Sequence, residues 1–176
     1  MNKTLLSAAL IAGFGIAAFA PQTARADGTI TFTGKVVANT CSFNVNSSGS
    51  ANGTVALPVA FTSALAASGA VTGKTPFTIV VSGCDSKLTS VQELFSGSNL
   101  MADGNLQNTA ATNNVEVQLL NGTTNSPINL NTGANSPVGT LSGGGVTLNY
   151  AAQYYATGVS TSGLVNTSVT YTTSYL

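Results

Sequence analysis

The chain of 176 residues contains five lysines and arginines, five aspartates and glutamates and no histidine, so its formal net charge is zero. A chain without a basic surface has no electrostatic means of binding nucleic acid, and a chain without histidine cannot use Ser–His or Cys–His catalysis. Since 43% of the residues are hydrophobic, the composition also argues against a disordered chain, which combines low hydrophobicity with high net charge.

The N-terminal region is typical of an export signal. Lys3 supplies a positive charge, residues 5–20 form an apolar stretch, and residues 24–26 read Ala-Arg-Ala, an A-x-A cleavage pattern. The apolar stretch is shorter and richer in small residues than a typical membrane span, and a retained N-terminal anchor is the alternative interpretation. We predict cleavage between Ala26 and Asp27, which leaves a chain of single-domain size.

Short segments that alternate apolar and polar side chains recur along the rest of the chain, and this alternation predicts strands. The predicted strands span residues 29–41, 53–61, 76–84, 114–122, 145–158 and 167–176. Pro58 restricts the second of these to a sheet edge or a bend. The Asn121-Gly122 pair is a turn signal, and residues 126–130 are a candidate return strand.

Helix signals are few. Residues 61–69 are compatible with one short helix, in which Thr62 or Ser63 is the N-cap and Gly69 ends the helix. Residues 86–95 are a second helix candidate. About seven short strands with frequent turns, and no linker that divides them, predict a single all-β sandwich.

Two cysteines, Cys41 and Cys84, lie in the exported part of the chain. An even number of cysteines in an exported protein indicates a disulfide, and two cysteines allow only one pairing. The alternatives are two free thiols or a pair of metal ligands. A metal pair is disfavoured because the cysteines are far apart in the sequence and no histidine is present.

The chain shows no catalytic arrangement of residues. Five carboxylates could in principle include the acid pair of a glycosidase, but there is no Trp to form a sugar platform. Solvated or capping carboxylates are therefore the preferred interpretation. We predict that the protein is not an enzyme and binds no cofactor or metal.

The most informative segments are the two ends of the mature chain, which both alternate like strands. Composition alone favours two ordinary strands of a closed sandwich. However, the stretches GTITFTGKVVANTC (28–41), PFTIVVSGCD (76–85), NVEVQLL (114–120) and YAAQYYATG (150–158), followed by Tyr175 beside the C-terminus, occur in a characteristic order. This ordered set, which covers residues 28–176, resembles the major subunits of type 1-like fimbriae that are assembled by the chaperone–usher route.

The resemblance implies an incomplete immunoglobulin-like β-sandwich that lacks its last strand, so that a hydrophobic groove stays open along the C-terminal strand. A periplasmic chaperone fills this groove first, and the N-terminal arm of the next subunit replaces it in the fibre. Such strand addition combines main-chain hydrogen bonds with side chains that enter pockets. The implied segments are a signal peptide (1–26), a donor-strand arm (27–36) and a pilin domain (37–176).

The resemblance also assigns roles to individual residues. The arm residues that would face the neighbour's groove or lead into the first strand are Ile30, Phe32, Gly34, Val36 and Val37. The residues that would border the groove are Val169, Tyr171, Thr173 and Tyr175. The Leu176 carboxylate would anchor the chaperone, and Cys41 and Cys84 would form the disulfide that joins the first two strands.

Two features depart from the family pattern. Only Asp27, Gly28 and Thr29 would precede Ile30 after cleavage at Ala26, so the arm is short. Residues 18–20 offer another A-x-A site, although the proline that follows disfavours it. The second departure is Thr173, where an apolar residue is usual, so we expect a local loss of groove hydrophobicity.

The sequence therefore predicts a structural subunit of a chaperone–usher fimbria that polymerises by donor-strand exchange into an adhesive fibre on the bacterial surface. Its expected partners are identical or related subunits bound head to tail, a periplasmic chaperone and an outer-membrane usher, with no nucleic acid and no cofactor. The alternatives are a minor or tip-proximal subunit of the same pathway, or a closed secreted β-sandwich that binds a small ligand or carbohydrate.

Overall fold

The structure is a computed structural model that describes residues 30–34, 36 and 41–176. The chain divides into two units, Met1–Lys35 and Val36–Leu176. In the first unit, residues 30–34 have no regular secondary structure and their side chains are exposed. The predictions made for Ala26, Asp27 and Val37 lie outside the described residues.

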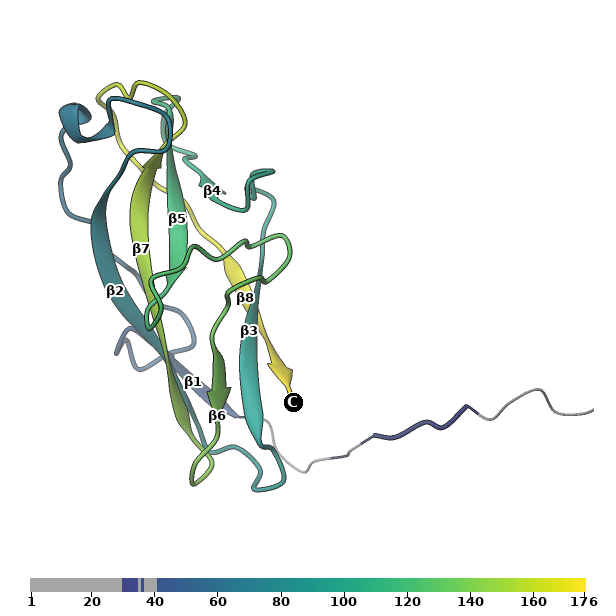
Figure 1. Ribbon diagram of the computed structural model, residues 1–176. Helices are drawn as coiled ribbons and strands as arrows, with labels where there is room; N and C mark the ends of the chain where they lie inside the picture. The colour runs from purple at the N-terminus through teal and green to yellow at the C-terminus, as the bar shows by residue number, and fades with distance from the viewer. Residues whose placement is uncertain (1–29, 35, 37–40) are drawn as a thin grey trace, which may run out of the picture. The chain divides into compact units, whose positions relative to one another are not determined.

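The second unit consists of two antiparallel β-sheets packed face to face (Figure 1). The five-stranded sheet has the order β1 (Ser42–Val45), β2 (Val71–Ser82), β7 (Val146–Ala156), β5 (Val115–Asn121) and β4 (Leu106–Gln107). The three-stranded sheet has the order β6 (Val138–Thr140), β3 (Ser90–Ser96) and β8 (Thr170–Tyr175). This arrangement confirms the predicted immunoglobulin-like sandwich class.

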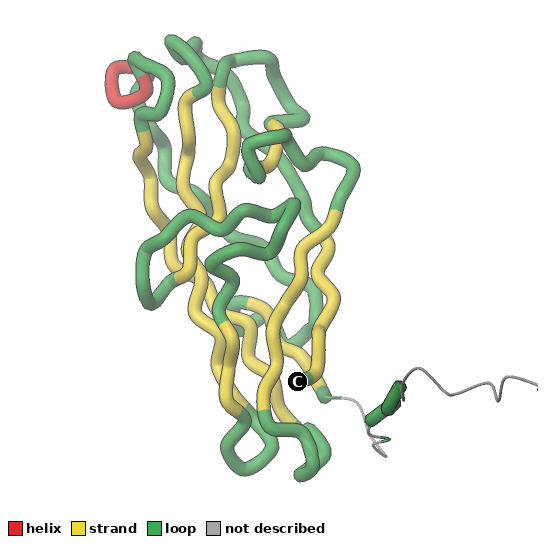
Figure 2. Tube along the Cα trace, turned by 45° about the vertical axis from the view of Figure 1, so that its right-hand side comes forward, coloured by secondary structure: helices red, strands yellow, loops and turns green. Residues whose placement is uncertain are grey.

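Helical structure in the described part is limited to one 3₁₀ turn, η1 (Thr62–Leu65), drawn in red in Figure 2. The predicted short helix at 61–69 is therefore present as a single turn, but its N-cap is Phe61 and no side chain caps it. Within the described residues, no helix has the length and apolarity needed to cross a membrane.

Most of the predicted strands are present. The predictions at 76–84, 114–122, 145–158 and 167–176 correspond to β2, β5, β7 and β8. The candidate return strand at 126–130 is present only as an isolated bridge between Leu120 and Pro127. The predicted helix at 86–95 and the predicted strand at 53–61 were wrong. The predicted segment 29–41 contains no strand among its described residues.

The two wrong predictions have physical reasons. Residues 86–95 are not a helix because Ser90–Ser96 form β3, the central strand of the smaller sheet, where Val91, Glu93 and Phe95 alternate into the interior. Residues 53–61 alternate like a strand but belong to no sheet. Pro58 lacks the N–H group that a ladder needs.

The core lies between the two sheets and is centred on Tyr150, which is 1% exposed. Phe77 of β2 stacks on the Tyr150 ring with centroids 5.3 Å apart. Phe95 of β3 meets the same ring edge-on at 5.5 Å. Tyr150 therefore connects both sheets, and such aromatic pairs add to the stabilisation that burial of apolar area provides.

The predicted disulfide between Cys41 and Cys84 is present and closes a loop with a sequence separation of 43 residues. It joins the residue before β1 to a residue just beyond β2. β1 has only four residues, and within the described part of the chain all four pair with β2 alone. The covalent link thus fixes a short edge strand that has few hydrogen bonds of its own.

We expect the double variant Cys41→Ser/Cys84→Ser to lose about 4 kcal/mol of unfolding free energy, the chain-entropy value for a loop of this length. Urea unfolding followed by circular dichroism measures this loss. The wild-type protein treated with a reductant serves as the matched control and should unfold at the variant's midpoint. A variant that unfolds at the midpoint of the oxidised wild type would contradict a stabilising role for the bridge.

Candidate functional site: an open groove beside the last strand

β8 is one of the two edge strands of the three-stranded sheet, and β1 is one of the two edge strands of the five-stranded sheet. Each has one strand neighbour among the described residues. A groove of about 1140 Å³ is lined by residues of both these edge strands. An immunoglobulin-like sandwich would place a further strand at this position, so the groove corresponds to a missing strand.

The four residues predicted to border the groove, Val169, Tyr171, Thr173 and Tyr175, all line it. They belong to β8 and to the residue just before it, which form one wall. The opposite wall consists of β1 and of residues 51–57. Core side chains form the floor: Phe77, Ile79, Phe95, Leu106, Val117, Leu119 and Ala152.

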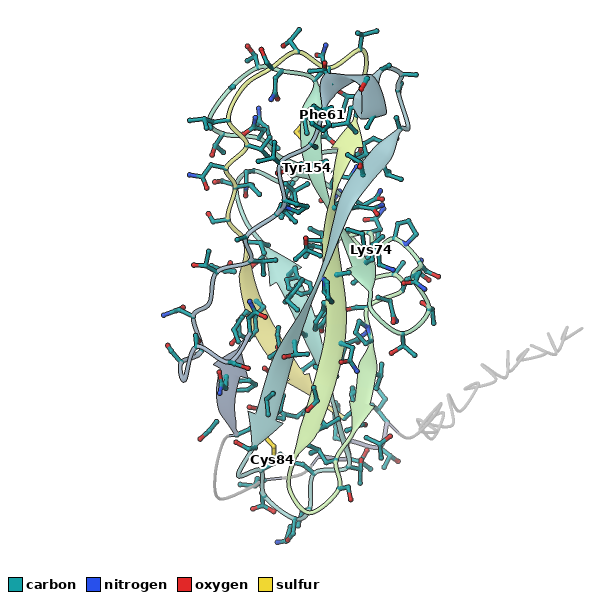
Figure 3. The ribbon with its side chains drawn as sticks, turned by 90° about the vertical axis from the view of Figure 1, so that its left-hand side faces the viewer. Phe61, Lys74, Cys84 and Tyr154 are labelled. Atoms are coloured by element: carbon teal, nitrogen blue, oxygen red, sulfur yellow. A yellow bond between two sulfur atoms is a disulfide. The ribbon has the colours of Figure 1, made fainter. Side chains whose placement is uncertain are left out.

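The groove extends along the sandwich, from the disulfide end to the opposite end. Its lining includes Cys41, which is bonded to Cys84, and also Tyr154. Figure 3 shows Cys84 at one end of the sandwich and Tyr154 with Phe61 near the other. Among the described residues, no charged side chain belongs to the lining. The site is therefore an elongated, uncharged surface suited to an extended apolar segment.

The outer edge of the β8 backbone has hydrogen-bonding groups without a partner among the described residues. The N–H of Leu176 donates to the carbonyl of Ser90 at 2.9 Å, and the N–H of Ser90 donates back at 3.3 Å. Hydrogen-bonded and non-hydrogen-bonded pairs alternate along an antiparallel ladder. The backbone groups of Tyr171, Thr173 and Tyr175 therefore point away from β3. All three of these residues belong to the groove lining.

Three contacts hold the opposite wall in place. Gly53 lies so close to β1 that a Cβ atom there would come within 2.6 Å of Val45 Cγ1 and 2.8 Å of the Val45 carbonyl oxygen. Tyr171 links the two walls, because its hydroxyl donates to the Ala51 carbonyl at 2.8 Å. Its ring also meets Phe43 edge-on at 6.1 Å. The walls are thus connected by the Tyr171 side chain.

A buried carboxyl lies next to the groove strand. Glu93 of β3 is 0% exposed and stands between Val91 and Phe95 on the inward face. Its Oε2 accepts a hydrogen bond of 2.8 Å from Thr173 Oγ1, whereas Oε1 has no partner among the described residues. Burial raises the pKa of the Glu93 carboxyl, and the Thr173 hydrogen bond offsets part of this rise.

This pairing explains why a polar residue stands in the groove strand. Thr173 lies directly opposite Glu93 in the β3–β8 register, so its hydroxyl supplies the only described hydrogen bond to the carboxyl. Without it, the buried carboxylate would have no partner for either oxygen, which is costly. The Tyr150 hydroxyl on β7 is also buried without a described partner. Burial and the charge of Glu93 raise the pKa of this phenol.

The other predicted site residues are found at the two ends of the described chain. Ile30, Phe32 and Val36 are 80%, 90% and 92% exposed, and Gly34 is exposed as well. At the opposite end, an oxygen of Leu176 accepts a hydrogen bond of 2.8 Å from Thr89 Oγ1. The C-terminus is therefore held at the start of β3, in line with the edge strand.

Sequence reasoning missed the wall at residues 51–57 and the role of Glu93. The signal for Glu93 was present, because the period-two pattern Val91, Glu93, Phe95 places the carboxyl on an apolar face. The helix interpretation of residues 86–95 concealed it. The wall at 51–57 gave a strand-like pattern because its residues face the groove, although it pairs with no strand.

The fold and the groove define the class of protein: an immunoglobulin-like sandwich with one unfilled strand position. A family model described as fimbrial protein matches residues 30–175. The F17 fimbrial protein of Escherichia coli is 43% identical over 176 residues, which cover 94% of this chain and 96% of that protein. The major fimbrial subunit SMF-1 of Stenotrophomonas maltophilia (strain K279a) is 39% identical over 171 residues, with coverages of 90% and 98%.

A solved chaperone–usher pilus structure has the same fold, with a TM-score of 0.61, 20% identity and coverage of 89% of this chain and 100% of its own. The chain therefore belongs to the fimbrial protein family. It is a structural subunit and not an enzyme, it polymerises with other pilins, and it is exported through the periplasm to a fimbria on the bacterial surface.

We expect Glu93→Gln to raise the stability of the subunit at neutral pH. A carboxyl whose pKa is raised in the folded state destabilises the fold once it is charged. Wild-type stability should therefore rise as the pH falls from the folded pKa toward the ordinary value of 4.5. The amide cannot ionise, yet it can still accept the Thr173 hydrogen bond.

Urea unfolding of both proteins between about pH 4 and pH 8 tests this prediction. The two stability curves should converge at the acidic end and separate toward neutral pH. Curves that run parallel over the whole range would contradict the raised pKa of Glu93.

Proposed function

We propose that this chain is a repeating structural subunit of a chaperone–usher fimbria and polymerises by donor-strand exchange. Residues 27–36 of one subunit would fill the groove beside β8 of the next. The single observation that carries the proposal is the unpaired edge of β8 beside an uncharged groove. The same chain carries a segment with exposed, alternating apolar residues at Ile30 and Phe32.

The dimensions of the two partners agree. β8 has six residues and spans about 20 Å at the usual rise per strand residue. Residues 30–36 would span about 23 Å in the same conformation. The alternation places Ile30, Phe32 and Gly34 on one face of an extended strand, so that one face enters the groove while the backbone pairs with β8.

The interaction energies favour assembly. Burial of Ile30 and of Phe32 would contribute about 1.5–3 kcal/mol each. The ladder bonds to Tyr171, Thr173 and Tyr175 would add about 1 kcal/mol each. Such contacts must exceed the entropy lost on association. Because the arm and the groove are different surfaces of one chain, the contact is heterologous and continues into a fibre instead of closing.

An unpaired edge strand invites aggregation, so the pathway requires a temporary partner. We infer that a periplasmic chaperone covers β8 before assembly and that an outer-membrane usher hosts the exchange. The Leu176 carboxylate, held by Thr89 at the end of β8, is the proposed chaperone anchor. In this proposal residues 1–26 are a signal peptide that is removed first, and residues 37–176 form the pilin domain.

The proposed role of the finished fibre is adhesion, with this chain as a major subunit. The similarity to proteins named as a fimbrial protein and a major fimbrial subunit supports a major role.

The closed-sandwich alternative expects both terminal segments to pair within their own sheets. Among the described residues β8 has one strand neighbour, and this favours the incomplete sandwich.

Phe32→Asp is expected to block polymerisation while leaving the chaperone complex intact. The substitution removes about 1.5–3 kcal/mol of burial and would place a charge in an uncharged groove, so we expect at least a tenfold loss of polymer. The multimer ladder in unboiled SDS extracts measures it. Thr33→Asp is the matched control, because its side chain lies on the opposite face of the arm. Normal multimers from Phe32→Asp would reject the assigned arm.

Gly34→Val tests the close backbone approach expected at this arm position. A Cβ at Gly34 meets no described atom within 4 Å, so the substitution should leave the subunit's own stability unchanged. We expect slower polymerisation than with Thr33→Val, an isosteric change that places the same valine side chain on the other face. Equal multimer yields from the two variants would show that no close approach occurs at Gly34.

A further inference from the structure

Thr173 has two roles at once in the structure. Its side chain lines the groove, and its hydroxyl is the only described partner of the Glu93 carboxyl, at 2.8 Å. Glu93 is 0% exposed, and its Oε1 has no described partner. The β8 side chains separate the Glu93 carboxyl from the open groove, and they form part of its polar and apolar environment.

We propose that Glu93 and Thr173 couple groove filling to proton uptake, so that subunits attach to one another more tightly as the pH falls. The inference rests on the proposed function and concerns the regulation of the same groove. The occupant is the N-terminal arm of a second copy of this chain.

The physical reason is the change in surroundings when a strand enters. In the open subunit, solvent in the groove lies on the far side of Tyr171, Thr173 and Tyr175. A strand paired with β8 replaces that solvent with apolar side chains such as Phe32. A charged group loses more free energy than a neutral one when nearby water is removed. Groove filling therefore favours the protonated form of Glu93.

The other groups facing Glu93 do not compete for this proton. Tyr150 from β7 and Tyr171 from β8 are the titratable groups beside it, and β1 and β6 carry none. Burial raises the pKa of both phenols, and the charge of Glu93 raises them further. Ser136, just before β6, donates to the Glu93 backbone carbonyl at 3.0 Å and does not titrate.

The direction of the pH dependence follows from the linkage between proton binding and subunit attachment. If the filled groove raises the pKa of Glu93 above its value in the open subunit, attachment takes up a proton. Attachment is then strongest below the open-state pKa and weakens as the pH rises through the filled-state pKa. Each unit of difference between the two pKa values changes the attachment equilibrium about tenfold.

Polymers assembled from the full-length chain test the proposal. The fraction of multimer that survives a fixed SDS treatment is measured as a function of pH for wild type, Glu93→Gln and Thr173→Val. Glu116→Gln is the matched control, because Glu116 is also a buried carboxyl but lies outside the groove lining and is bonded to Asn105 at 3.1 Å.

We expect wild-type and Glu116→Gln polymers to resist dissociation increasingly as the pH falls. Glu93→Gln polymers should have lost this dependence. Thr173→Val removes the donor that favours the charged form, so its transition should move to higher pH. The infrared band of a protonated carboxyl should be stronger in wild-type polymer than in the chaperone-bound subunit, and this difference should disappear in Glu93→Gln.

Equal pH dependence in wild-type and Glu93→Gln polymers would overturn the inference while leaving donor-strand exchange intact. Failure of donor-strand exchange itself would appear separately, as normal polymer from Phe32→Asp at any pH. If Glu93→Gln does not fold by circular dichroism, Thr173→Val decides alone, and an unshifted transition in that variant overturns the proposal.

Discussion

The unpaired edge of β8 is the constraint on which the rest of the molecule depends. Among the described residues β8 is hydrogen-bonded to β3 alone, and alternation along the ladder directs the backbone groups of Tyr171, Thr173 and Tyr175 to the other side. A strand edge of this kind, beside an uncharged groove, needs a partner. The chain's own N-terminal segment has a matching length and pattern but belongs to a separate unit. The proposed assembly between copies would pair this edge with the N-terminal segment of another subunit.

The sandwich is held together largely without charge. Charged residues make up 6% of the chain, and amide side chains take their place in the interior of the fold. Gln153 donates to Gln118 at 2.9 Å and Gln118 donates to Asn105 at 3.2 Å. Such bonds do not titrate and are not screened by salt. Glu93 is an exception to this pattern, because it is a buried carboxyl beside the groove, and the proposed link between assembly and pH rests on its surroundings.

Much of the fold could be predicted from the sequence, because strands with one buried face repeat every two residues. β2, β5, β7 and β8 were found in this way, and the cysteine pair had only one possible bridge. β3 was missed because its residues include good helix formers, and the pairing with β8 that makes it a strand is separated by about 80 residues of sequence (compare Glu93 and Thr173). Local propensity does not contain such long-range information.

The candidate site was predicted unevenly for the same reason. The groove residues on β8 and the alternation of the arm are local patterns, and both were visible. The wall at residues 51–57 depends on the contact between Gly53 and Val45, and the burial of Glu93 depends on Thr173. These are tertiary relationships. In the proposed assembly the arm pairs with the groove of a second copy of this chain, and such a contact between copies does not appear in a single subunit.

The most direct test of this account is a high-resolution electron cryomicroscopy map of the assembled fibre. We predict that residues 30–36 of one subunit lie as a strand between β8 and β1 of the next, hydrogen-bonded to β8, with Phe32 over the apolar floor. A map in which these residues return to their own subunit, or lie in solvent while another segment fills the groove, would contradict it.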